Sequence, residues 1–202
     1  MKKLSVFVAA LLLFGFVNKP ISLTDQERKT AADLLQQTED GVISSVAGLS
    51  EAQLNFKPAP DKWSVSECIK HIAVTEQGLW QMTNGAIQAT ANPEKRSEIK
   101  ATDDQVVQMI ESREQKVKTY PSMEPQNTPY KSMEEAMASF KVDRAKLIEY
   151  VKTTNDDLRN HVAALPMGSF DSYQMILFIA AHSNRHTKQI EEVKADPNFP
   201  KN

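Results

Sequence analysis

Two histidines placed four residues apart are the clearest chemical feature of this chain. They are His182 and His186, in the stretch AAHSNRHTKQI, and the 202-residue sequence contains only two other histidines. Residues at positions i and i+4 of a helix lie on the same face, so both imidazoles can reach one metal ion. Alternatively, both are core residues held by hydrogen bonds, because leaving a buried polar group unpaired costs about 1–3 kcal/mol.

His71 is the third candidate ligand, in the segment SVSECIKHIAVTE. The inward stripe of the last helix also includes Gln189, one turn beyond His186, which is expected to contact a metal ligand or a substrate. The spacing does not show whether His71 lies opposite His182 and His186. From the residues alone, a three-histidine metal site and a set of core histidines are therefore open alternatives.

The remaining histidine and the single cysteine carry weaker signals. His161 follows the fourth predicted helix among polar residues, in NDDLRNHV, and is expected to be a solvated surface residue. Cys68 lies on the apolar line of its helix, so we expect a buried, unreactive thiol rather than a ligand or nucleophile. The sequence contains no glycine-rich phosphate loop, no G-x-S-x-G and no H-E-x-x-H motif. These patterns identify no catalytic acid or base.

The elements that must position these side chains are predicted to be helices. Four segments fit the capping box, in which Ser or Thr is followed three residues later by Glu or Gln; they begin at Thr24, Ser64, Thr102 and Ser132. Asp171, followed by Gln174, is a close variant. The apolar spacing after these caps predicts helices over residues 24–47, 64–90, 102–118, 132–154 and 171–194. No segment alternates apolar and polar residues long enough to predict a convincing strand.

Together these elements indicate an all-α fold with ample length for one core. The four long helices make a four-helix bundle, and the shorter one, over residues 102–118, is polar nearly all round. We therefore expect the shorter helix outside the bundle, or in the crossover between the second and third main helices. A single domain, residues 21–202, contains all five.

The first 20 residues are expected to be a signal peptide rather than part of the domain. Two lysines follow Met1, and residues 4–17 form an uncharged apolar run. This run has about the length of a signal-peptide core and is short for a membrane span, which needs roughly 20 residues. We expect export to the periplasm or the cell exterior, with an uncleaved N-terminal membrane anchor as the alternative. The formal charge of −2 gives no electrostatic footprint for nucleic acid.

Three segments resemble the DinB-like superfamily, which is related to the bacillithiol and mycothiol S-transferases. They are SVSECIKHIAVTE, FKVDRAKLIEYVKTT and FDSYQMILFIAAHSNRHTKQIEEVK, and the resemblance covers about residues 24–200. Its most specific parts are the histidine-bearing helix after a proline-rich W-S turn and the closing H-x3-H-x2-Q-I helix.

The resemblance implies a bundle with a long crossover between its second and third main helices. It also implies a divalent metal held by His71, His182 and His186, and it makes a homodimer an expectation. Three imidazoles accept zinc, nickel, iron or manganese, of which we expect zinc or nickel. Several members of the superfamily are metal-dependent thiol transferases or isomerases. The expected export argues against thiol transfer, because the thiol cofactors of those enzymes are cytosolic.

These observations support three hypotheses about function. The first is a metal-dependent enzyme that hydrolyses a small molecule or transfers a thiol or another group. The second is a non-catalytic exported module that binds a metal or a small ligand, which a fourth protein ligand on the ion would favour. The third is a purely structural bundle without a metal, in which His71 lies away from the other two histidines.

Overall fold

The helices begin at the predicted caps. In the computed structural model, which describes residues 22–115 and 117–201, Thr24, Ser64 and Thr102 each form a full capping box. Ser132 and Asp171 also accept a hydrogen bond from the backbone N–H three residues further on. The predicted signal peptide, residues 1–20, lies outside the described residues.

The main helices agree with the predicted ranges to within two residues at each end. They are α1 (Asp25–Val46), α3 (Val65–Gln88), α5 (Met133–Thr153) and α6 (Ser172–Lys194). The other elements are short: α2 (Glu51–Asn55), η1 (Pro93–Glu98), α4 (Asp103–Glu111), η2 (Pro121–Met123), η3 (Pro125–Asn127), β1 (Val162–Leu165) and β2 (Gly168–Asp171). Within the described ranges, no helix combines the length and apolarity that crossing a membrane requires.

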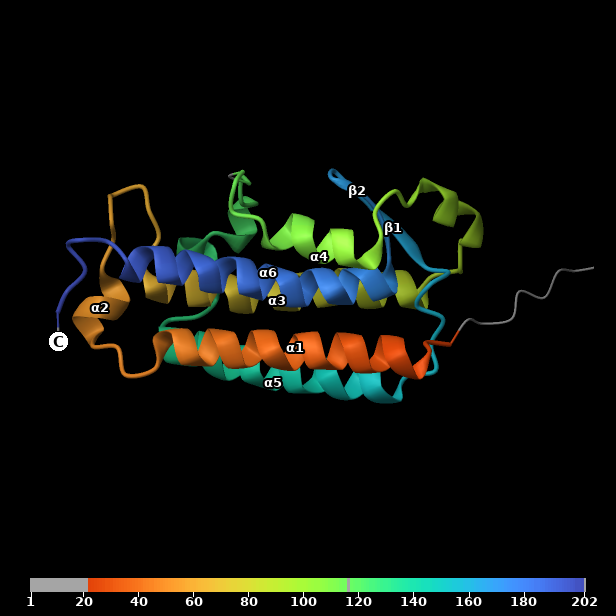
Figure 1. The fold of residues 1–202 in the computed structure, drawn as a ribbon, viewed down its shortest axis with the longest axis horizontal. Helices are drawn as coiled ribbons and strands as arrows, with labels where there is room; N and C mark the ends of the chain where they lie inside the picture. The colour runs from red at the N-terminus through yellow and green to blue at the C-terminus, as the bar shows by residue number, and fades with distance from the viewer. Residues whose placement is uncertain (1–21, 116, 202) are drawn as a thin grey trace, which may run out of the picture.

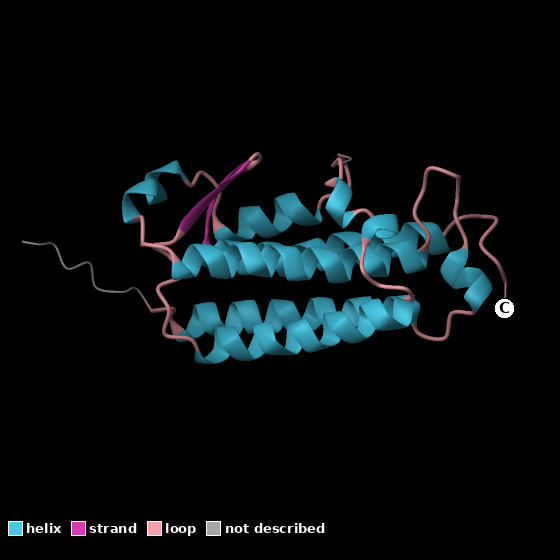
Figure 2. Ribbon diagram, turned by 180° about the vertical axis from the view of Figure 1, so that it is seen from behind, coloured by secondary structure: helices cyan, strands magenta, loops and turns pink. Residues whose placement is uncertain are grey.

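The four main helices pack as a ring, in the order α1, α6, α3, α5 and back to α1 (Figures 1 and 2). The helices α3 and α5 run in the same direction, so the chain must return along the bundle between them. Residues 89–132 form this crossover. At one end Asn92 N–H donates to Asn160 O (2.8 Å), and at the other Lys70 Nζ donates to Lys131 O (3.1 Å). The all-α bundle and its long crossover are confirmed.

Two local predictions are wrong. The segment after α5 forms a hairpin, in which β1 pairs antiparallel with β2. Strands of four residues are too short to show alternation, and Gly168, with φ 143°, permits the reversal. The helix predicted over residues 102–118 ends at Glu111, because Ser112 is extended and turns the chain. That helix, α4, packs on α6 and buries Val106 and Ile110, so it is not polar all round.

One buried arginine joins all four main helices. Arg144 of α5 is fully buried, and its guanidinium forms a bidentate ion pair with Glu76 of α3, at 2.6 and 2.7 Å. It also donates to Leu35 O and Thr38 Oγ1 of α1, at 2.7 Å each, and to Ser183 Oγ of α6, at 2.9 Å. These bonds occupy the five N–H donors of the side chain. The network therefore fixes how the four helices lie relative to one another.

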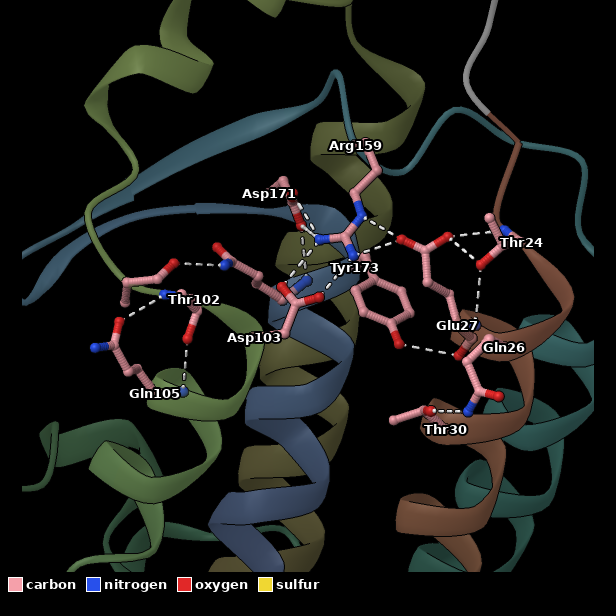
Figure 3. A network of polar contacts seen from close by, with 12 residues as sticks. Thr24, Gln26, Glu27, Thr30, Thr102, Asp103, Gln105, Arg159, Asp171 and Tyr173 are labelled. Atoms are coloured by element: carbon pink, nitrogen blue, oxygen red, sulfur yellow. Dashed lines mark hydrogen bonds and ion pairs between the residues drawn. The ribbon is translucent and has the colours of Figure 1, made fainter.

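A second arginine connects three helix N-termini (Figure 3). Arg159, between α5 and β1, pairs with Glu27 of α1, Asp103 of α4 and Asp171, the N-cap of α6. Its guanidinium also lies 4.1 Å from the centre of the Tyr173 ring. Carboxylates at helix N-termini complement the helix dipole, and one guanidinium offsets the repulsion among three of them. This network positions the starts of α1, α4 and α6 together.

Removing Arg144 should destabilise the fold strongly. Arg144→Ala leaves the Glu76 carboxylate buried without a partner, and we expect the free energy of unfolding to fall by about 3–5 kcal/mol. The double variant Arg144→Met/Glu76→Leu removes both charges and should lose less than the single variant. Urea unfolding followed by circular dichroism measures both.

The control for this experiment is Lys29→Ala, which removes an exposed ion pair with Asp33. We expect its free energy of unfolding to change by less than about 1 kcal/mol. An Arg144→Ala protein as stable as this control would show that the buried pair is not needed for the fold.

Candidate metal centre

Histidines from two helices converge inside the bundle. His71 lies in the second turn of α3, and His182 and His186 lie one turn apart on α6. One ring nitrogen of each histidine lies within 4.8 Å of the other two. The ring centres are 5.1 Å apart for His71 and His182, 4.4 Å for His71 and His186, and 4.5 Å for His182 and His186. The structure therefore places His71 opposite the α6 pair, which the sequence spacing left open.

Hydrogen bonds to two of the rings assign their protons. His71 Nδ1 lies 2.8 Å from the backbone oxygen of Met123, and His186 Nδ1 lies 2.9 Å from Gln189 Oε1. Both partners are acceptors, so each Nδ1 carries the proton and donates. In a neutral imidazole, the Nε2 atom then presents a free lone pair. His71 and His186 can thus both bind a metal through Nε2.

The three rings are neutral at neutral pH, which is the form that binds metals. Burial lowers the pKa of His71 to about 4, against a smaller opposing effect of the hydrogen bond to Met123. Burial lowers the pKa of His182 well below its usual value, and the neighbouring His71 and Arg185 disfavour its protonated form further. The pKa of His186 is lowered by burial first and then by the neighbouring histidines. Burial therefore keeps protons from competing with a metal.

The geometry fits a divalent metal. His182 Nε2 and His186 Nε2 lie 3.2 Å apart. Two ligand atoms that each lie about 2.0–2.1 Å from a tetrahedral ion are about 3.4 Å from one another. Without a metal, His182 Nε2–H can donate to His186 Nε2 across this contact, and a bound cation would take the place of that proton. Among the described residues, no other His, Cys, Asp or Glu joins the three.

Aromatic side chains surround the cluster. The Trp63 ring centre lies 4.8 Å from that of His71 and 6.0 Å from that of His186. Phe178 stacks against His182 with a centroid distance of 6.5 Å. His71 and His186 are buried, whereas His182 is partly exposed. His182 is therefore the most exposed of the three rings.

Gln189 contacts a candidate ligand, as the sequence indicated. Its Oε1 accepts from His186 Nδ1 and, at 3.4 Å, from Arg113 Nη1, which supports the assignment of this atom as oxygen. The Arg113 guanidinium also pairs with Glu192, at 2.7 and 3.0 Å. Arg113 lies two residues beyond α4, so the crossover approaches the α6 side of the cluster. Such contacts orient a ligand and hold its tautomer.

The other cysteine and histidine candidates lie elsewhere. Cys68 is fully buried, as expected, and burial raises the pKa of its thiol, which disfavours the reactive thiolate. The prediction for His161 is wrong, because its exposed fraction is only 9% and its Nδ1 lies 2.8 Å from Ala86 O. The hairpin after α5 brings it back against the end of α3, which its polar neighbours in the sequence did not reveal.

The sequence reasoning missed the contributions of the crossover. The Met123 carbonyl and Arg113 carry no local signal, since their role depends on how residues 112–115 and 117–131 approach α3 and α6. A close approach at α3 is visible only in the structure: a Cβ at Gly78 would lie 3.0 Å from Met123 Cε. The sequence did offer a signal for Arg185, because this residue stands between the two histidines of the H-x3-H motif.

The model of the DinB superfamily matches residues 34–190, which is most of the chain. The chain belongs to the DinB superfamily. The family resemblance seen in the sequence is therefore confirmed.

Two Bacillus subtilis proteins are similar to this DinB-superfamily protein. YuaE of strain 168, an uncharacterized protein, is 24% identical over 152 residues, covering 75% of this chain and 89% of YuaE. The solved structure of YfiT is described as a probable metal-dependent hydrolase with an unusual four-helix bundle topology. It matches with a TM-score of 0.59 at 12% identity, covering 90% of this chain and 94% of the YfiT chain. This likeness establishes the shared fold.

Removing the contact from Gln189 should weaken metal binding without unfolding the protein. Gln189→Leu keeps the size of the side chain but leaves His186 Nδ1 without its acceptor. We expect zinc affinity to fall about 10–100-fold. Competition with a chromophoric chelator measures this affinity.

Asn184→Leu is the matched control, an amide replaced on the same helix with no hydrogen bond to the three histidines. It should bind zinc as the unaltered protein does. Equal zinc affinity in Gln189→Leu would show that this hydrogen bond does not support the site.

Proposed function

We propose that this DinB-superfamily protein is a metal-dependent enzyme that hydrolyses a small molecule, with His71, His182 and His186 as metal ligands. The observation that carries the proposal is the cluster of three neutral imidazoles, which no fourth His, Cys, Asp or Glu joins within the described residues. Structural zinc sites use four protein ligands, whereas catalytic sites keep a position for water or substrate. The fold is shared with YfiT, a probable metal-dependent hydrolase by its description.

The residues of the chain divide the work of such a site. Neutral ligands leave the charge of a divalent ion uncompensated, and the ion supplies Lewis acidity for hydrolysis when it is bound. The Met123 carbonyl and Gln189 hold the protons of two ligands on Nδ1, which turns their Nε2 atoms inward. Trp63 and Phe178 cover ring faces and limit the access of water. We assign no general base, because no carboxylate of the described residues joins the cluster.

The finer parts of the proposal rest on the sequence and on the family. We propose zinc or nickel as the metal, with iron and manganese as alternatives that the same ligands accept. The apolar N-terminal segment supports export to the periplasm or the cell exterior. Export favours hydrolysis over thiol transfer, since cytosolic thiols would be out of reach. A homodimer stays a prediction from the resemblance.

Metal content of untagged protein tests the proposal first, since a His-tag would supply ligands of its own. We expect near-stoichiometric metal by mass spectrometry, lost in His182→Ala/His186→Ala because two of three ligands are gone. His161→Ala, which removes a buried histidine outside the cluster, should keep its metal. A panel of ester, amide and phosphoester substrates should then be hydrolysed by the loaded protein and not by the double variant.

Two results would contradict this proposal. The first is an unaltered protein that contains no metal and takes up neither added zinc nor added nickel, which would leave the histidines as core residues. The second is a metal-loaded protein without activity on any of the substrates, which would favour a non-catalytic metal-binding module.

A further inference from the structure

A buried arginine beside the three histidines has no carboxylate partner. Arg185 lies on α6 between His182 and His186, and its exposed fraction is 9%. Its guanidinium donates to Gln115 O at 2.7 Å and to Ile110 O at 3.5 Å, in the last turn of α4 and the crossover segment just after it. Within residues 22–115 and 117–201, Arg185 forms no ion pair.

This arrangement is unusual because a buried arginine is nearly always paired. Backbone carbonyls accept its hydrogen bonds, but they do not neutralise its charge. Taking an unpaired charge out of water costs free energy that a nearby anion would restore. Arg185 directly precedes His186 on α6, and its charge is close enough to His182 to lower the pKa of that ring.

A second guanidinium approaches from the crossover. Arg113 Nη1 lies 3.4 Å from Gln189 Oε1, which in turn contacts His186. Its other nitrogens form the fork that a carboxylate prefers, with Glu192 as the present partner. The Glu192 side chain is 55% exposed, so water partly screens this pair. A ligand carboxylate or phosphate can therefore replace Glu192 at Arg113.

The charges around the cluster favour an anion. No carboxylate joins the three histidines among the described residues, and a divalent ion held by them would add two positive charges. Arg185 and Arg113 add two more, against the single exposed carboxylate of Glu192. A neutral or cationic substrate would leave this excess uncompensated.

We propose that the site accepts a small molecule that carries a carboxylate or phosphate next to the reacting group, with Arg185 and Arg113 binding the oxyanion. This inference rests on the proposed function and adds the class of its substrate. Glu192 occupies Arg113 in the absence of that ligand and competes with it. Arg185 and Arg113 thus determine specificity, while the histidines hold the metal.

Anion binding by zinc-loaded, untagged protein tests the inference without a known substrate. Isothermal titration calorimetry with acetate, inorganic phosphate and the neutral analogue acetamide should show binding of an anion and none of acetamide. The tighter of the two anions indicates whether the natural group is a carboxylate or a phosphate. Arg185→Met should weaken binding of the anion about tenfold or more, since it removes a charge-assisted hydrogen bond to the oxyanion.

Glu192→Gln gives a result in the opposite direction that misfolding cannot produce. Its exposed side chain stops competing for Arg113, so the anion should bind about threefold tighter or more. Lys188→Met is the control: it removes a positive charge from the same helix, where Lys188 pairs with Glu111. It should change the affinity less than about twofold.

The possible failures are distinguishable. Protein that takes up neither added zinc nor added nickel overturns the proposed function and this inference with it. Zinc-loaded protein that binds acetate and phosphate no better than acetamide overturns the inference alone. The inference is also overturned if Glu192→Gln binds the anion no more tightly than the unaltered protein and Arg185→Met weakens anion binding no more than Lys188→Met does.

Discussion

The buried ion pair of Arg144 and Glu76 is the constraint on which the candidate centre depends. A charge pair away from water is stable only when its remaining donors are also satisfied, and here the partners come from α1, α3 and α6. Few relative placements of the helices meet that requirement. Glu76 follows Thr75, whose hydroxyl lies 3.3 Å from His71 Nδ1, and Ser183 follows His182. The network therefore aligns α3 with α6 where the histidines face each other.

Burial acts in opposite ways on the groups of the centre. It keeps the imidazoles neutral and thus able to bind a metal, and it makes the unpaired guanidinium of Arg185 costly. A metal ion that carries an anionic ligand would satisfy both groups. The imidazole lone pairs would bind the cation, and the Arg185 guanidinium would lie near the anion. The crossover matters for the same reason: it supplies carbonyls to His71 and Arg185 and brings Arg113 to Gln189.

Local patterns predicted most of the helices and part of the centre. Caps such as Ser64 and Asp171 work through bonds within four residues, so their outcome is written in a short stretch of sequence. The same holds for His182 and His186, whose shared face follows from the helical period. The errors lie where distant contacts decide: the hairpin after α5 buries His161, and α4 ends where the chain turns towards α6.

The sequence by itself determined the main helices and placed two histidines on one helical face. Through its resemblance to a family, it also indicated a third histidine ligand. Only the tertiary structure decided that His71 lies opposite that pair, that the Met123 carbonyl assigns its proton, and that Arg185 is buried without a carboxylate. The physical reason is one of range. Helical periodicity and capping act over one turn of the chain, whereas the approach of α3, α6 and the crossover follows from packing and from the buried Arg144 network, which join residues far apart in sequence.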